Sequence, residues 1–345
     1  MFVPVIEFLP HPASQGFRQS RRHVLQPDGM HSQDVPFGAI ATRLMLDIPK
    51  RLRILIGIQS GIGCQQEKWT GRGETASEGR KSVSNSSIAE VRLVLEARDV
   101  SVQFGGVKAL TNVSVSVKAG EICGLIGPNG AGKSTFLNAA TRLVNYTSGS
   151  IMLGGQPLEG VASREMIGMG IARTFQNLGI YASMTVLENV MLGAHHQFGG
   201  KFAQAIFAPS RARAVERSAR EKAMAVLEEV GMAELAPRTA GSLPYPLQKR
   251  MEIARALAAE PEILLLDEPA GGLTHGEVHE FGSLVDGIRR KRNLSILLIE
   301  HHMGLVMSLC DRIVVLHLGR NLAEGTPSEI KSNDAVIAAY LGKAA

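Results

Sequence analysis

The sequence predicts an α/β protein in which short buried strands alternate with helices. Its strongest signals are brief runs of β-branched and leucine residues that adjoin helical patterns, as the buried strands of an α/β sheet do. An antiparallel β lobe should come first, because two β-rich runs there flank a turn signal at Gly105-Gly106. The lobe runs are 91–95 and 113–117, the core strands are 122–126, 263–266, 296–299 and 313–316, and mainly helices are expected over about 185–235, including 211–230.

Composition and charge exclude several classes of protein. The chain has 345 residues, of which 45% are hydrophobic and 20% are charged, so it can bury a sizeable globular core. Its net charge of +5 arises mainly in residues 1–90. No basic stripe accompanies this charge, and we therefore expect no nucleic-acid partner.

The cysteines and the apolar runs indicate a cytoplasmic chain. Cys64, Cys123 and Cys310 lie far apart without C-x-x-C spacing, which argues against a disulfide framework or a zinc site. No apolar run approaches the roughly 20 residues that cross a bilayer. The first ten residues also lack the basic region and cleavage site of a secretory signal.

The chain divides into an extension and one large domain. Residues 1–90 mix polar and small residues without a sustained period, so we expect a poorly ordered extension. An alternative for 43–58 is an amphipathic helix on a membrane surface. Met30 and Met45 offer internal starts, so part of this extension is not necessarily translated in the natural protein. The large domain is expected over 91–345, with a helical subdomain at about 177–249.

A phosphate-binding motif follows the first core strand. Residues 127–134 match G-x-x-x-x-G-K-[ST] and lie between a predicted strand and a helix that should reach residue 143. Backbone N–H groups of such a loop surround phosphate oxygens, Lys133 reaches the β- and γ-phosphates, and Ser134 can bind Mg²⁺. The sequence thus predicts a P-loop NTPase core of the RecA-like kind. The predicted ATP contacts are Gly127, Pro128, Asn129, Gly130, Ala131, Gly132, Lys133, Ser134 and Thr135.

Two acidic residues follow a later core strand. Asp267 stands where a P-loop protein needs a carboxylate for Mg²⁺, and Glu268 is placed to polarise a water for attack on the γ-phosphate. Two acids after a strand often mark only a solvated turn. The P-loop makes the catalytic interpretation the stronger one.

These motifs resemble an ATP-binding cassette (ABC) ATPase over about 91–342. The segments that carry the resemblance, besides the P-loop and the two acids, are 251–257 (MEIARAL) and 299–301 (IEH). Further segments resemble one of the two ATPase subunits of bacterial branched-chain amino acid importers. They are 170–177 (GIARTFQN), 184–190 (MTVLENV) and 339–342 (AYLG).

The resemblance implies roles for single residues. Phe104 would stack on adenine, and Gln176 would sense Mg²⁺ and the attacking water. The segment after Gln176 would contact a permease helix. His301 would be the switch histidine at the γ-phosphate. His302 and the pair His195-His196 are expected to face solvent, because no cluster of metal ligands accompanies them.

The signature that acts on the nucleotide of the opposite subunit departs from the family pattern. The corresponding residues are Leu243, Pro244, Tyr245, Pro246, Leu247 and Gln248, and Pro246 stands where the family keeps glycine. Proline lacks an N–H, so one donor to the γ-phosphate is lost and weaker closure is expected. Thr274 stands where many cassettes place Asp.

The resemblance therefore implies an ATP- and Mg²⁺-dependent ATPase on the cytoplasmic face of the membrane, powering uptake of branched-chain or related amino acids. Its partners would be permease subunits, a second ATPase subunit, identical or different, and indirectly an extracytoplasmic binding protein. Two alternatives stay open. One is the ATPase of a lipopolysaccharide-export-like or other ABC system. The other is a nucleotide-gated subunit with little turnover because of Pro246.

Overall fold

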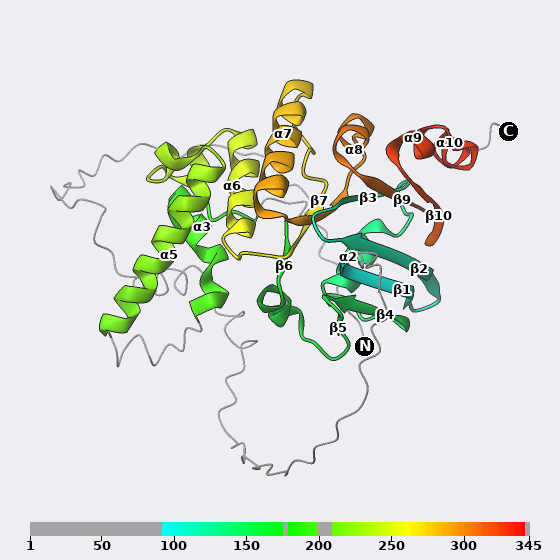
Figure 1. Ribbon diagram of the computed structural model, residues 1–345, viewed down its shortest axis with the longest axis horizontal. Coiled ribbons are helices and arrows are strands. Elements are labelled where there is room, and N and C mark those ends of the chain that lie inside the picture. Colours follow the sequence, from blue (N-terminus) through cyan, green and yellow to red (C-terminus); the bar gives the residue numbers. More distant parts are fainter. Residues whose placement is uncertain (1–91, 175–178, 199–208, 342–345) are drawn as a thin grey trace, which may run out of the picture. The chain divides into compact units, whose positions relative to one another are not determined.

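The computed structural model describes residues 92–174, 179–198 and 209–341 (Figure 1). All of them belong to one of the chain's two compact units, 57–345. The extension 1–90, the proposed amphipathic helix 43–58 and Gln176 lie outside the described residues. The predictions for them are not tested.

A six-stranded sheet forms the core of this unit. Its order is β10-β9-β3-β8-β7-β6, parallel except for β10, which runs antiparallel to β9. Every residue of β3, β7 and β8 is buried, which explains why these strands appear as uninterrupted apolar runs. The four predicted core strands are confirmed. The strands are β3 (Ile122–Ile126), β6 (Ile171–Arg173), β7 (Ile263–Asp267), β8 (Ser295–Ile299), β9 (Arg312–His317) and β10 (Arg320–Gly325).

A second, antiparallel sheet forms the predicted β lobe. Its order is β2-β1-β4-β5, and β1 and β2 are joined by a tight turn at Gly105-Gly106, with Phe104 opposite Val107. Along β2 a buried residue alternates with a more exposed one, as in a sheet with one face on the core. The strands are β1 (Leu93–Phe104), β2 (Val107–Lys118), β4 (Ser148–Leu153) and β5 (Gln156–Pro157).

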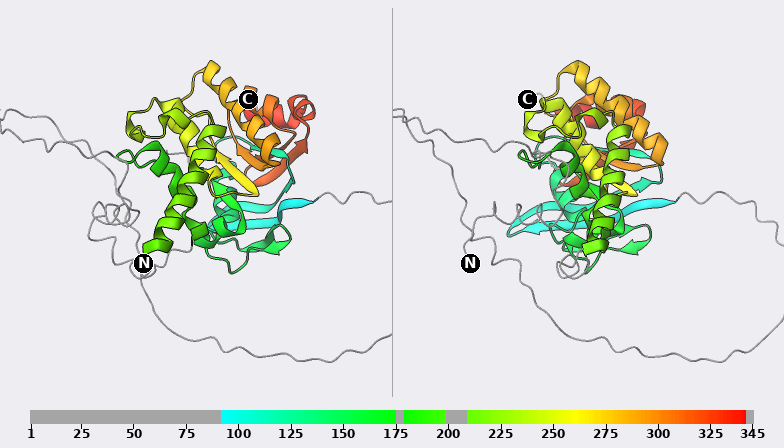
Figure 2. Two further views of the ribbon diagram at one scale, coloured as in Figure 1. Left: turned by 60° about the vertical axis from the view of Figure 1, so that its left-hand side comes forward. Right: turned by 90° about the vertical axis from the view of Figure 1, so that its left-hand side faces the viewer.

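Helices surround the two sheets. In Figure 1 and the left view of Figure 2, α3, α5 and α6 lie together and away from α9 and α10, and they contact one another, as a helical subdomain requires. The predicted helix to residue 143 is shorter: α2 ends at Ala140, and Arg142 has a φ of +57°. The helices are α2 (Lys133–Ala140), α3 (Val186–Gly193), α5 (Pro209–Glu229), α6 (Tyr245–Leu257), α7 (His275–Arg292), α8 (Met303–Leu309), α9 (Pro327–Lys331) and α10 (Asp334–Leu341).

Arg312 joins the two sheets. Its Nε donates to Glu121 Oε1 at 2.8 Å and its Nη2 donates to the Ser116 carbonyl oxygen of β2 at 2.5 Å. Burial, the largest influence, raises the pKa of Glu121. Hydrogen bonds from Arg312 and the Lys118 N–H nevertheless hold this pKa below its usual 4.5. The pair therefore stabilises the fold above about pH 4.5, and this contribution is lost as the pH falls through the depressed pKa.

We expect Arg312→Met to lower the free energy of unfolding at pH 7 by about 3 kcal/mol, because Glu121 stays buried and charged without its partner. Urea denaturation measures this loss. The difference from the parent should shrink as the pH falls to 4, because in the variant burial is no longer opposed by Arg312, the pKa of Glu121 rises and the carboxylate becomes protonated. Glu324 is the matched control, since its side chain is 51% exposed and Glu324→Gln should cost under about 1 kcal/mol. Equal losses in the two variants would contradict this account.

Candidate nucleotide-binding site

The phosphate-binding motif forms the turn between β3 and α2. Two of its glycines are required by close packing. A Cβ at Gly127 (φ +153°) would lie 2.2 Å from the Leu316 carbonyl oxygen, and a Cβ at Gly132 (φ +99°) would lie 2.6 Å from Leu110 Cδ2. Larger residues would therefore displace the loop from β9 and β2. Between these glycines, Asn129 and Gly130 are exposed, Pro128 is half-buried and Ala131 is buried.

The first turn of α2 supplies N–H groups to the same turn. Gly132 is the N-cap and no side chain caps the helix, so the N–H groups of its first turn are directed at the loop. No acidic residue lies in this turn to compete for them. The positive end of the helix dipole adds to their attraction for phosphate. Ser134 and Thr135 lie here, exposed and half-buried respectively.

Lys133 lies across the loop. Its Nζ donates to the carbonyl oxygens of Gly127 at 2.7 Å and Pro128 at 3.1 Å. Burial lowers the pKa of Lys133, while the charges of Glu268 and Asp267 act in the opposite direction. Both acids therefore lie close enough to Lys133 for their charges to act on its ammonium group.

Asp267 ends β7 and is held by a residue that the sequence analysis gave no role. Arg173, at the end of β6, forms a 2.9 Å ion pair with Asp267 Oδ2, and each side chain is only 9% exposed. Arg173 also donates to Asn138 Oδ1 of α2 at 2.7 Å. The guanidinium therefore bridges Asp267 to the helix that follows the P-loop. Arg173 and Asp267 are 94 positions apart.

Glu268 adopts a conformation that non-glycine residues seldom adopt. Its φ is +48°, its N–H donates to the Ile299 carbonyl oxygen at 2.9 Å, and its side chain is 26% exposed. Such backbone strain concentrates at functional sites. The carboxylate is turned toward His301, whose Nδ1 lies 4.0 Å from Glu268 Oε2. His301 itself is 66% exposed and accessible to a ligand.

The oxygen donors present fit Mg²⁺. Ser134 offers a hydroxyl and Asp267 a carboxylate, and Mg²⁺ is usually held by one or two such protein groups together with phosphate and water. Among the described residues, no three His, Cys, Asp or Glu side chains gather into a metal cage. Gln176, the other predicted ligand, lies outside the described residues. Thr174, two positions earlier, accepts from the Asp267 N–H at 3.4 Å.

Phe104 lies at the end of β1 and is 50% exposed, beside Val107, which is 68% exposed. The lobe that carries them is tied to the P-loop through the β9–β10 turn. The Thr111 N–H donates to the Gly319 carbonyl, and the Gly319 N–H donates to the Ala131 carbonyl. These bonds hold the lobe that carries Phe104 in a fixed position relative to the phosphate-binding loop.

The signature residues begin α6. Pro244 is the N-cap and Pro246 takes the second helical position, where a missing N–H breaks no helical hydrogen bond. Tyr245 is 41% exposed, and its hydroxyl donates to the Gly271 carbonyl at 3.1 Å. The Gln248 side chain donates to the carbonyl of the buried Leu243. Leu247, the remaining signature residue, lies in the first turn of α6.

Thr274, which departs from the family pattern, caps α7. It forms a capping box with Glu277, whose carboxylate accepts from the Thr274 N–H at 2.7 Å. Threonine therefore fills the helix-starting role that Asp could also fill.

Comparisons with known proteins show the family of this chain. Residues 110–271 match the ABC transporter family model, and 320–345 match the branched-chain amino acid ATP-binding cassette transporter model. The high-affinity branched-chain amino acid transport ATP-binding protein BraF of Pseudomonas aeruginosa is 42% identical over 73% of this chain and 99% of its own. The corresponding protein LivG of Escherichia coli K12 is 44% identical over 73% of this chain and 98% of its own.

Solved structures show the same fold. A nucleotide-free ATP-binding cassette from an ABC transporter matches 73% of this chain and all of its own, with 31% identity and a TM-score of 0.64. The ADP conformation of an ABC transporter cassette matches with 31% identity and a TM-score of 0.63, over 73% of this chain and 99% of its own. The chain belongs to the ATP-binding cassette family of transporter ATPases and, within it, to the branched-chain amino acid transport ATP-binding proteins.

Proposed function

We propose that this chain binds and hydrolyses ATP with Mg²⁺ to power import of branched-chain or related amino acids through separate permease subunits. The observation that carries the proposal is the convergence of the P-loop, Asp267, Glu268 and His301 at the carboxyl ends of adjacent parallel strands. Ligands of open α/β sheets bind at this edge. The amino-acid class comes from the names of BraF and LivG, to which the chain is similar over almost their whole lengths.

Each residue has a separate task in this mechanism. Lys133 exchanges its carbonyl partners for β- and γ-phosphate oxygens, while Ser134 and Asp267 would hold Mg²⁺. The metal, when bound, neutralises charge between the phosphates. Glu268 orients a water in line with the γ-phosphate and accepts its proton. His301 and Gln176 contact the γ-phosphate and the attacking water, and Phe104 stacks on adenine.

A cleft that Arg173 helps to line is the proposed docking site for the permease. It is lined by Leu143, Tyr181, Leu192, Glu252 and Arg255, among others. Leu143 is 53% and Tyr181 45% exposed, which places two large apolar side chains on one surface. Arg255 donates to the Gly179 carbonyl and so holds the cleft wall where the chain emerges after 175–178. We propose that a cytoplasmic helix of the permease docks here.

The proposed location follows from this partner. None of the helices in the described part of the chain is long and apolar enough to cross a membrane. The chain would therefore lie on the cytoplasmic face, held by permease subunits, with an extracytoplasmic binding protein supplying the amino acid. A second ATPase subunit would complete the closed dimer.

Pro246 favours a second candidate function, a nucleotide-gated subunit that closes and opens with ATP but hydrolyses little of it. The proline fits α6 without strain, but its position offers no N–H to a phosphate of the opposite subunit. In a dimer with a different ATPase, one site would keep full contacts and one would be weakened. In a homodimer both would be weakened.

We expect Glu268→Gln to lower kcat for ATP hydrolysis about 10²- to 10⁴-fold, because the attacking water loses its base. ATP binding should persist, measured by equilibrium binding of a fluorescent ATP analogue to the full chain. Glu262→Gln is the control: Glu262 precedes the same strand, β7, and its side chain is 54% exposed. Full ATP turnover in the Glu268→Gln variant would contradict the assignment of Glu268 as the catalytic base.

Pro246→Gly should strengthen ATP-driven dimer closure about 10- to 100-fold, the value of one restored charge-assisted hydrogen bond. Closure is measured by light scattering against ATP concentration in the Glu268→Gln background, which prevents turnover. Pro327, in the first turn of α9, is the matched proline, and Pro327→Gly should leave closure unchanged. No gain from Pro246→Gly would retire the gating candidate.

Tyr181→Ser should weaken association with the permease about tenfold, because a large apolar contact is lost. The chain's melting temperature should change little, since the side chain is exposed. Co-purification with detergent-solubilised permease subunits gives the readout. Leu341→Ser, which replaces an apolar side chain on α10 that is 80% exposed, is the control. Equal binding by both variants would place the docking surface elsewhere.

A further inference from the structure

Glu300 is a fully buried carboxylate between β8 and His301. Its side chain is 0% exposed, and its oxygens accept three backbone N–H bonds. Oε1 accepts from Ala270 at 2.7 Å, while Oε2 accepts from His301 at 2.9 Å and from His302 at 3.1 Å. The donors come from two different loops, one after β7 and one after β8.

These contacts fix the two loops that carry the proposed base and the switch histidine. Ala270 follows Glu268 by two residues, and the Gly271 N–H donates back to the Glu268 carbonyl. The His301 ring lies between carboxylates, with Nδ1 3.9 Å from Glu300 Oε2 and 4.0 Å from Glu268 Oε2. A carboxylate offers about four acceptor positions and only accepts, so it can bind three N–H groups at once. No neutral side chain of this size offers that.

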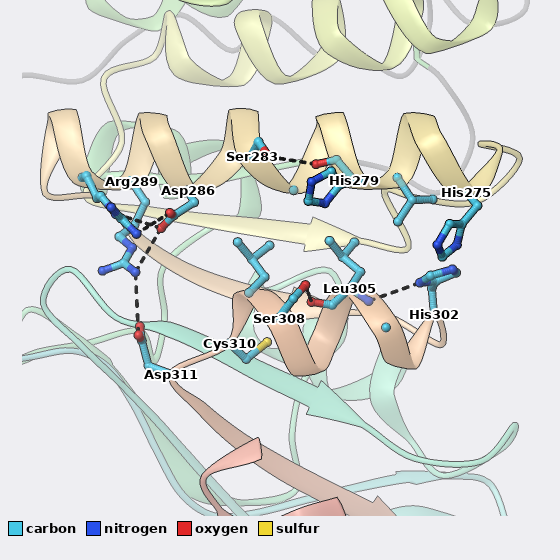
Figure 3. Close-up of a pocket in the computed structure, with 15 residues that line it drawn as sticks. His275, His279, Ser283, Asp286, Arg289, His302, Leu305, Ser308, Cys310 and Asp311 are labelled. Carbon is cyan, nitrogen blue, oxygen red and sulfur yellow. Dashed lines mark hydrogen bonds and ion pairs between the residues drawn. The ribbon is translucent and has the colours of Figure 1, made fainter. Parts of the chain in front are cut away.

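A second set of contacts joins the same loops from outside. His302 Nδ1 accepts from the Leu305 N–H at 3.2 Å and so caps α8, and its ring centroid lies 6.0 Å from that of His275, the first residue of α7. Both rings line the groove between α7 and α8 (Figure 3). The loops after β7 and β8 are therefore joined twice: by the buried Glu300 carboxylate, and nearer the surface by the contact between His302 and His275. We call this arrangement the junction.

We propose that Glu300 is a positioning residue, which holds the Glu268 loop and the His301 loop at a fixed separation so that both act on one γ-phosphate. This rests on the proposed ATPase function of the site. Glu300 itself touches neither nucleotide nor water in this scheme. Ala270 adjoins Gly271, whose carbonyl accepts from the hydroxyl of Tyr245 in the signature. The same carboxylate therefore also sets the position of the loop that is bonded to the signature.

Kinetics of two Glu300 variants test the proposal. Both oxygens of Glu300 accept backbone N–H groups, so in Glu300→Gln the amide NH₂, which cannot accept, replaces one acceptor. We expect kcat to fall about 10- to 100-fold, the fold-change that corresponds to one or two lost charge-assisted hydrogen bonds. The KM for ATP should change less than about threefold, since the phosphate contacts stay intact. Glu300→Asp keeps both acceptor oxygens and should recover much of kcat. An unchanged kcat in Glu300→Gln, or no recovery by Asp, overturns the proposal.

Glu121→Gln is the matched control. Glu121 is also a buried carboxylate that accepts a backbone N–H, from Lys118 at 2.7 Å, but it lies before β3, at the opposite edge of the sheet from the P-loop. Its replacement should lower the melting temperature and leave kcat unchanged. If both variants lose kcat in proportion to lost stability, Glu300 is structural only and the proposal fails.

Hydrogen exchange separates this proposal from the proposed ATPase function. In the full chain without nucleotide, amides of 270 and 301–302 should exchange at least about tenfold faster in Glu300→Gln than in the parent, because their acceptor is lost. Glu121→Gln should leave them protected. If the unsubstituted chain does not hydrolyse ATP but this exchange pattern is seen, the proposed ATPase function is refuted while the positioning role of Glu300 is supported. An active parent with unchanged exchange in Glu300→Gln would refute the junction alone.

Discussion

The register of three parallel strands determines the site. Asp267, the last residue of β7, lies opposite Ile299 of β8, and Ile299 lies opposite Leu125 of β3. The chain therefore leaves all three strands at one level. Glu268, Glu300 and the start of the P-loop each follow within two residues. A shift of one residue in β7 would turn Asp267 to the other face of the sheet, away from Lys133.

This convergence gathers negative charge, and the fold balances each acid differently. Asp267 is paired with the Arg173 guanidinium, Glu268 is near Lys133 and His301, and Glu300 is satisfied by backbone N–H groups. Three unpaired acids at one sheet edge would repel one another and destabilise the domain. The separate partners are consistent with the different roles proposed for the acids: Asp267 for the metal, Glu268 for water and Glu300 for loop position. Arg173 also lines the proposed docking cleft, so one side chain adjoins both the permease surface and the metal ligand.

The sequence predicted what depends on local spacing. The P-loop, the buried strands and the acids after β7 are continuous segments, and their pattern is sufficient to identify them. The edge strand β10 was not predicted, because it has only two apolar residues, Leu322 and Ala323, which stand side by side, and none of its residues is buried. The Arg173–Asp267 pair and the three bonds to Glu300 join residues that are distant in sequence, so only the tertiary fold reveals them. Thr274 was interpreted as a departure from the family, yet its capping box depends on Glu277 three residues later, a local signal that was present in the sequence.

The effect of Pro246 is limited by how the signature is attached to its own chain. Proline at the second position of α6 removes no helical hydrogen bond, and the Tyr245 hydroxyl still donates to the Gly271 carbonyl. The helix end is therefore held in place by its neighbour, and what changes is only the set of donors it presents outward. The loss of one outward-facing N–H would weaken the proposed ATPase dimer without lowering the stability of the subunit itself. Because Gly271 adjoins Ala270, which Glu300 holds, the signature, the loop after β7 and the switch histidine form one connected chain of contacts. If Glu300 positions both loops as proposed, a displacement of the signature would be passed to His301 through these hydrogen bonds.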